Sequence, residues 1–99
     1  MLNISIIIPN FNDSKLLSFS VKMFKSNMTE NDEILIIDDG STDNSISIIN
    51  SLQKKYSNIK LICHKTNKGV PEALNTGLKH SSCDLVYFGS NNDFILKKF

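Results

Sequence analysis

Four short apolar runs, separated by segments of helical periodicity, constrain the fold of this 99-residue chain more than any other feature. Each run is rich in β-branched residues and lacks strict alternation, which is typical of strands buried on both faces of a sheet. The runs are Ile4–Ile8, Ile34–Ile37, Ile59–Cys63 and Leu85–Phe88. They predict four strands at the centre of an α/β domain.

Apolar residues in the intervening segments recur at spacings of three and four, as on one face of a helix. The first helix is expected to begin near Ser14, the second to be capped by Thr42 or Asp43, and the third to have Pro71 in its first turn. Their apolar faces would use Leu17, Val21, Phe24 and Met28, then Ile46, Ile49, Leu52 and Tyr56, then Val70, Ala73, Leu74, Gly77 and Leu78. The predicted order is β-α-β-α-β-α-β. Short connections and right-handed crossovers then give a parallel four-stranded sheet with helices on both faces.

The composition is that of a single globular domain over residues 1–99, with 40% hydrophobic and 21% charged residues. A net charge of +1 argues against nucleic acid as a partner. Apolar runs of about five residues predict no transmembrane segment, and the chain starts without the basic and apolar regions of a signal peptide. Cys63 and Cys83 lack metal-ligand spacing, so we interpret them as reduced, largely buried thiols of a cytoplasmic protein.

The last segment, from Phe94 to Phe99, is too short for another complete helix–strand unit. We therefore expect the chain to be the N-terminal fragment of a larger domain. An exposed sheet edge or an uncovered sheet face would then favour a homo-oligomer.

In an open parallel sheet, ligands bind beyond the carboxyl ends of the strands, so the residues after each apolar run form the candidate site. These segments are Pro9–Asp13, Asp38–Asp43, His64–Gly69 and Gly89–Asp93. Acid and amide side chains collect in them, with few cations. Such an edge suits recognition of hydroxyls and bases, and a divalent metal with oxygen ligands, better than direct phosphate pairing.

Three motifs in these segments resemble the opening of the family 2 glycosyltransferases. They are Ser5-Ile-Ile-Ile-Pro9-Asn-Phe11-Asn12, then Ile36-Ile-Asp38-Asp39-Gly40-Ser41-Thr42-Asp43, then Asn67-Lys68-Gly69 followed by Ala73-Leu74-Asn75-Thr76-Gly77. The resemblance implies a truncated half of the Rossmann-like GT-A fold. It also implies binding of a nucleoside diphosphate sugar, with a UDP-sugar as the expected donor. The sugar would be transferred to an acceptor hydroxyl on a sugar or lipid-linked acceptor, in surface polysaccharide or glycolipid synthesis.

The resemblance also implies roles for matching residues. Asp39 would accept hydrogen bonds from the base or ribose of the nucleotide, as a fixed carboxylate can. Pro9 and Phe11 would line the base pocket, and Asp38 would orient the loop or share the nucleoside contact. The alternative is that the two carboxylates only form a turn and cap the second helix, and that Phe11 is a packing residue. Two adjacent carboxylates exceed what a cap needs, so we favour the binding role.

The fourth segment departs from the family pattern. An Asp-x-Asp-type motif usually holds Mn²⁺ or Mg²⁺ there, whereas this chain reads Ser90-Asn91-Asn92-Asp93 with one carboxylate. We expect Asp93 as a metal ligand, with Asn92 adding a carbonyl oxygen to a weakened site. The alternative is a polar turn after the last strand.

None of these residues is assigned as the catalytic base, which we expect in a part of the domain beyond this chain. That missing part would also carry any peripheral contact with the inner face of the membrane. The alternative function is a non-catalytic nucleotide-sugar-binding module. A phospho-receiver is disfavoured because the first strand ends in Pro9-Asn10, and a dinucleotide-binding domain because no Gly-x-Gly-x-x-Gly follows that strand. His64 is expected to end a strand and His80 to lie in the last turn of the third helix.

Overall fold

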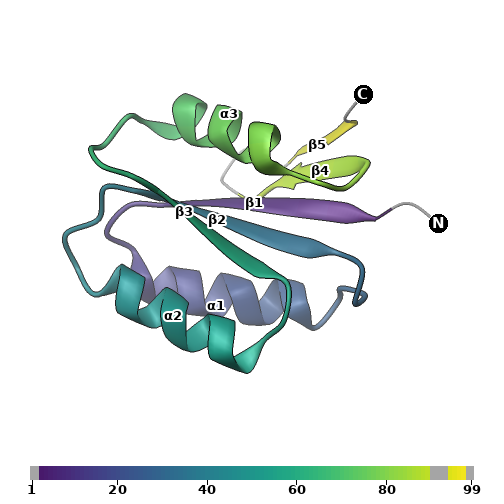
Figure 1. Cartoon of the computed structure of the whole chain (residues 1–99). Coiled ribbons are helices and arrows are strands. Elements are labelled where there is room, and N and C mark those ends of the chain that lie inside the picture. Colours follow the sequence, from purple (N-terminus) through teal and green to yellow (C-terminus); the bar gives the residue numbers. More distant parts are fainter. Residues whose placement is uncertain (1–2, 90–93, 98–99) are drawn as a thin grey trace.

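A five-stranded sheet lies between a pair of helices on one face and a single helix on the other (Figure 1). The computed structural model describes residues 3–89 and 94–97. The strands are β1 (Ile4–Asn10), β2 (Glu33–Asp39), β3 (Ile59–His64), β4 (Leu85–Phe88) and β5 (Phe94–Lys97). The helices are α1 (Ser14–Lys25), α2 (Ser45–Lys55) and α3 (Val70–His80). No helix in this described part of the chain has the length and apolar character needed to cross a bilayer.

The strand order is β3-β2-β1-β4-β5, and the four predicted strands are parallel to one another. The predicted parallel sheet with helices on both faces is therefore confirmed. The fifth strand was not predicted: β5 pairs antiparallel with β4, from Phe88 opposite Phe94 to Leu85 opposite Lys97. An antiparallel neighbour needs only a short connection, whereas the prediction considered only parallel units with a helix between strands.

Strand alternation sorts the apolar side chains into two cores. The core beneath α1 and α2 contains Ile6, Ile8, Leu17, Val21, Ile34, Ile36, Ile49 and Ile59. The core beneath α3 contains Ile7, Leu35, Ile37, Ala73, Val86 and Phe88. Both faces of β1 and β2 are thus covered, which explains why their sequences are apolar without alternation.

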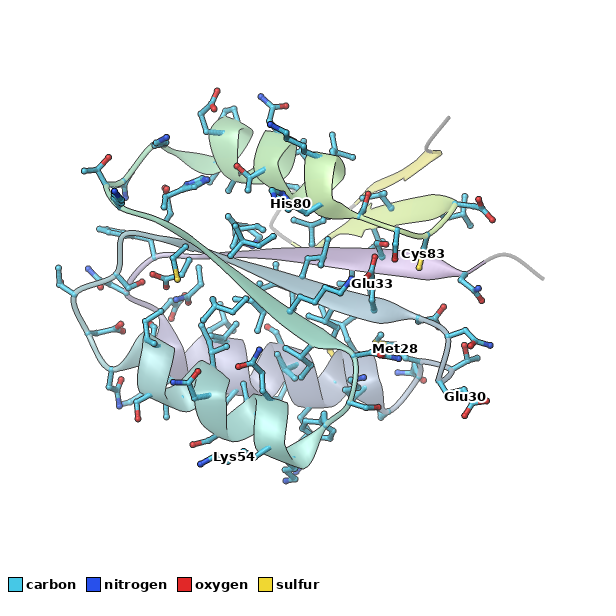
Figure 2. The ribbon with its side chains drawn as sticks, viewed as in Figure 1. Met28, Glu30, Glu33, Lys54, His80 and Cys83 are labelled. Carbon is cyan, nitrogen blue, oxygen red and sulfur yellow. The ribbon has the colours of Figure 1, made fainter. Side chains whose placement is uncertain are left out.

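The predicted helical faces are correct at their centres and differ at their ends. Met28 (labelled in Figure 2) and Tyr56 lie beyond the ends of α1 and α2, although both still pack against the core on that side. Val70, the first residue of α3, is 53% exposed and does not belong to its packed face. The N-cap residue of α2 is Asn44, not Thr42 or Asp43 as expected, although Asp43 Oδ1 does accept the Ser45 backbone N–H at 2.9 Å.

Cys63 was expected to be buried, and this prediction was wrong. The side chain is exposed because β3 is an edge strand of the sheet. Cys83 is half-buried, and both cysteines are free thiols. His80 lies in the last turn of α3, as predicted, where Nδ1 contacts the backbone oxygen of Thr76 at 2.9 Å.

A buried carboxylate links the strands at the amino end of the sheet. Glu33 Oε2 accepts hydrogen bonds from Ser5 Oγ at 2.5 Å and from the backbone N–H and Oγ of Ser82 at 2.7 and 2.9 Å. Lys60 Nζ lies 3.0 Å from Glu33 Oε1. Figure 2 shows Glu33 close to Cys83, whose backbone N–H donates to Ser5 Oγ at 3.2 Å. Burial raises the pKa of Glu33, but these hydrogen bonds outweigh it and lower the pKa to about 2.

This carboxylate makes stability depend on pH. We expect the free energy of unfolding to fall as the pH is lowered from about 4.5 to about 2, because the folded carboxylate resists protonation more than the unfolded one. The contribution of Glu33 is fully present above about pH 4.5 and amounts to about 3 kcal/mol. Urea unfolding at a series of pH values measures it, with Glu33→Gln as the comparison. An equal loss of stability in the wild type and in Glu33→Gln would contradict this role.

Candidate functional site

The two adjacent carboxylates at the end of β2 face opposite sides of the sheet. Side chains alternate along a strand, so Asp38 lies on the side of α1 and α2 while Asp39 lies on the side of α3. Both are buried, at 2% and 5% exposure. Their hydrogen-bond partners are separate sets of residues. The pair therefore serves two different purposes and does not form one site with two carboxylates.

Asp38 joins the loops that follow β1 and β2. Its Oδ1 accepts hydrogen bonds from Asn10 Nδ2 at 3.0 Å and from Ser41 Oγ at 2.6 Å, and its Oδ2 accepts the Ser41 backbone N–H at 3.0 Å. Asn12 extends this link: its N–H donates to Ser41 Oγ at 3.0 Å, and its Oδ1 accepts the Thr42 N–H at 2.7 Å. These are the contacts of a residue that orients the loop.

Asp39 binds the loop that follows β3 and the start of α3. Its Oδ1 accepts the Lys68 N–H at 2.9 Å and lies 2.7 Å from His64 Nδ1, while its Oδ2 accepts the Gly69 N–H at 2.8 Å. Burial raises the pKa of Asp39, but the hydrogen bonds from His64, Lys68 and Gly69 outweigh burial and hold the pKa below its usual value. The carboxylate is therefore charged, and the nearby amino end of α3 favours that charge.

His64 connects Asp39 to the body of α3. The parallel register places the last residue of β3 directly opposite Asp39, the last residue of β2. The imidazole is 8% exposed, and its Nε2 lies 2.7 Å from Thr76 Oγ1 in the second turn of α3. Both ring nitrogens thus have partners, one in the sheet and one in the helix.

Gly40 allows the loop after β2 to lie against the loop after β3. Its φ is +77°, a conformation that favours glycine. A Cβ atom at this position would lie 2.9 Å from both the Asn67 backbone nitrogen and the Thr66 carbonyl carbon. The close approach keeps the two loops together beside Asp39.

A pocket of about 110 Å³ lies where the strand order reverses, between the carboxyl ends of β1 and β4. Ligands of open α/β sheets bind at such a position, which is at the left of the sheet in Figure 1. Pro9 and Phe11 both line this pocket, together with Leu16 and Gly89. Phe11 is 47% exposed, so its ring is available to a ligand. Asp38 and Asp39 do not line the pocket, so the structure brings two of the four predicted nucleotide-site residues together there.

The two predicted metal ligands, Asn92 and Asp93, lie outside the described residues. Within residues 3–89 and 94–97, no three His, Cys, Asp or Glu side chains come together as a metal site. Each carboxylate oxygen of Asp38 and Asp39 already has at least one hydrogen-bond partner within the protein.

Residues 5–97 match the family model of glycosyl transferase family 2. The chain belongs to glycosyl transferase family 2. This family 2 domain is 39% identical over 92 residues to an uncharacterized glycosyltransferase of Haemophilus influenzae, covering 93% of the chain and 37% of that protein. It is 35% identical over 97 residues to the poly(ribitol-phosphate) beta-glucosyltransferase of Bacillus spizizenii, covering 95% of the chain and 15% of that protein.

Solved structures have the same fold. The S. aureus TarS structure in complex with UDP superimposes with a TM-score of 0.75 at 28% identity, covering 88% of this chain and 26% of that one. The mannosyltransferase of Pyrobaculum calidifontis, in complex with GDP-Man and Mn²⁺, superimposes with a TM-score of 0.76 at 22% identity, covering 84% and 25%. The GT-A assignment is thereby confirmed. The family 2 domain spans 15 to 37% of the length of the curated relatives and structures named here.

Sequence reasoning missed the part that His64 and Thr76 play in this family 2 domain. His64 was interpreted only as the end of a strand, and Thr76 only as part of a motif. One signal was available: two parallel strands that end at the same level bring their last residues side by side. An Asp that ends one apolar run and a His that ends the next are therefore candidates for contact.

Proposed function

We propose that this family 2 domain binds the nucleoside diphosphate part of a sugar donor, a UDP-sugar, through Asp39, Pro9 and Phe11. The observation that carries the proposal is the fixed, charged carboxylate of Asp39 at the carboxyl edge of the sheet. Its Oδ2 accepts a hydrogen bond from the Gly69 N–H, and a carboxylate oxygen has lone pairs for two. An N–H of the base or a ribose hydroxyl is a suitable second donor.

Exposure and shape support the contact through Pro9 and Phe11, which line the pocket that Asp39 does not line. Phe11 offers a ring face next to a pocket, and aromatic faces are a common surface for stacking a base. Asp38 orients the loop that carries Phe11 through its bonds to Asn10 and Ser41. In this assignment one carboxylate contacts the ligand and its neighbour holds the loop.

The activity we propose for the whole protein is transfer of the sugar to an acceptor hydroxyl in surface polysaccharide or glycolipid synthesis. The family match supports it, as does the glucosyltransferase activity for which the Bacillus spizizenii relative is named. The chain would then correspond to the N-terminal donor-binding part of a larger catalytic domain, and the catalytic base would lie in the remainder. We propose that the transfer takes place at the cytoplasmic side of the membrane, with a nucleotide sugar as the donor.

A divalent metal, Mn²⁺ or Mg²⁺, is part of the proposal, with Asp93 and Asn92 as its ligands. The metal would neutralise charge on the diphosphate leaving group. One carboxylate and one amide oxygen make a weak site for a hard cation, because carboxylate charge provides much of the binding.

Metal removal tests this part of the proposal. We expect UDP affinity, measured by calorimetry, to fall by about three- to tenfold when Mg²⁺ is replaced by EDTA. Asp93→Asn should bind UDP equally in the two buffers. The control is Asp84→Asn, an exposed carboxylate directly before β4 at the amino end of the sheet, which should retain the metal effect. A wild-type affinity for UDP that is independent of Mg²⁺ would contradict the proposed metal site. It would not contradict the nucleoside contact.

A further inference from the structure

His64 occupies a buried position between the proposed nucleoside-binding carboxylate and helix α3. Its Nδ1 lies 2.7 Å from Asp39 Oδ1, and its Nε2 lies 2.7 Å from Thr76 Oγ1. The imidazole is 8% exposed and the Asp39 side chain 7% exposed. A ring so enclosed is not itself a surface for a ligand, so its effect on a ligand must pass through its neighbours.

The hydrogen-bond chemistry fixes the direction of these contacts. An ionised carboxylate only accepts, so Nδ1–H of His64 donates to Asp39. If the ring is neutral, Nε2 accepts the Thr76 hydroxyl proton, and if the ring is charged, Nε2–H donates to the Thr76 oxygen. The ring can therefore keep both partners in either state. Thr76 holds the ring in place, and the ring holds the carboxylate.

Asp39 needs such a support because the terminal torsion of an Asp side chain is soft. His64 and the Lys68 N–H both bind Oδ1, whereas Oδ2 accepts the Gly69 N–H. Without the imidazole, only the Lys68 and Gly69 N–H groups would hold the carboxylate, and its plane could tilt about the terminal torsion. The oxygen that faces the ligand would then no longer be fixed.

We propose that His64 is a positioning residue for the donor nucleotide: it fixes the Asp39 carboxylate in the orientation that accepts the nucleoside, and Thr76 fixes His64. This inference rests on the proposed nucleoside contact of Asp39 and adds a residue to it. His64 does not touch the nucleotide in this arrangement and takes no part in the chemical step.

A pair of variants with the same shape tests the proposal in the 99-residue chain. Asn and Leu are similar in size, but only Asn can place an N–H near the position of Nδ1. We expect His64→Leu to weaken UDP binding about tenfold, and His64→Asn to remain within about threefold of the wild type. Near-UV circular dichroism confirms that both variants are folded. Equal losses in the two folded variants would overturn the proposal, because a role in packing alone would not distinguish them.

A double-mutant cycle shows whether His64 acts through Asp39. In an Asp39→Asn background, His64→Leu should change UDP affinity by less than about twofold, because the carboxylate that it positions is absent. A full further loss of about tenfold would mean that His64 contributes independently of Asp39, which would overturn the proposal.

A measurement without ligand separates this inference from the proposed function. The amide proton shifts of Lys68 and Gly69 report their hydrogen bonds to Asp39. They should move toward random-coil values in His64→Leu and stay near wild-type values in His64→Asn. Failure of the wild type to bind UDP would overturn the proposed donor site. Unchanged amide shifts of Lys68 and Gly69 in His64→Leu would overturn the positioning role of His64.

Discussion

Replacement of Asp39 by asparagine is expected to weaken UDP binding by roughly 10- to 100-fold, the largest effect of any single change in the site. The amide cannot accept at both ends, so its NH₂ group would face the N–H of either Lys68 or Gly69. A hydrogen bond to a charged acceptor is lost from the ligand, and the remaining donors are left without their charged partner. Isothermal titration calorimetry with UDP measures the change.

The matched control for this change is Asp43→Asn in the same loop. Asp43 is an exposed carboxylate that accepts the Ser45 N–H, and an asparagine oxygen can accept the same bond. We expect its UDP affinity to stay within about twofold of the wild type. Wild-type affinity in a folded Asp39→Asn variant would contradict the nucleoside contact, because both substitutions remove one negative charge and differ only in position.

Substitution of Gly77 by valine is expected to destabilise the domain by about 4 kcal/mol or more. A Cβ atom on Gly77 would lie 2.5 to 2.8 Å from Cγ2, Cδ1 and Cγ1 of Ile7, a fully buried side chain of β1. Helix α3 would have to move away from the sheet, and the strand ends that carry the site would separate from it. Urea unfolding measures the loss.

A double substitution shows that the contact with Ile7 is the cause. Gly77→Ala should destabilise by about 1 to 2 kcal/mol in the wild type, because the clash exceeds the gain in helix propensity. In an Ile7→Ala background the three clashing atoms are gone, so Gly77→Ala should stabilise by about 1 kcal/mol relative to that background. The same destabilisation in both backgrounds would show that Ile7 is not what limits the size of residue 77.

The fold was predictable where local pattern and global packing agree. The apolar runs of β1 and β2 have no alternation because two helical layers cover them, and this same fact made them recognisable as parallel central strands. Gly77 could be foreseen as a helix packing position, since a glycine inside a helical pattern suggests close approach. The antiparallel β5 was missed because the short segment after β4 carries no helix, and only units containing a helix were considered.

The candidate site was predictable in position but only partly in detail. Motifs and the carboxyl-edge rule placed Pro9, Phe11, Asp38 and Asp39 at one end of the sheet. Asp38 and Asp39 have different roles because their side chains lie on opposite faces of the sheet. Predicting those faces requires the strand boundaries and the register. The contact between Asp39 and His64 joins residues 25 positions apart and likewise depends on register. The motifs therefore located the loop after β2 but gave no indication that His64 contacts Asp39.

An amide-resolved NMR titration of this chain with UDP, in the presence of Mg²⁺, tests the central claim most directly. Binding at the proposed site predicts saturable shifts centred on Phe11, Asp39, Lys68 and Gly69, with residues at the amino end of the sheet such as Glu33 unchanged. No shifts at millimolar UDP in a folded sample, or shifts confined to the opposite end of the sheet, would contradict donor binding through Asp39.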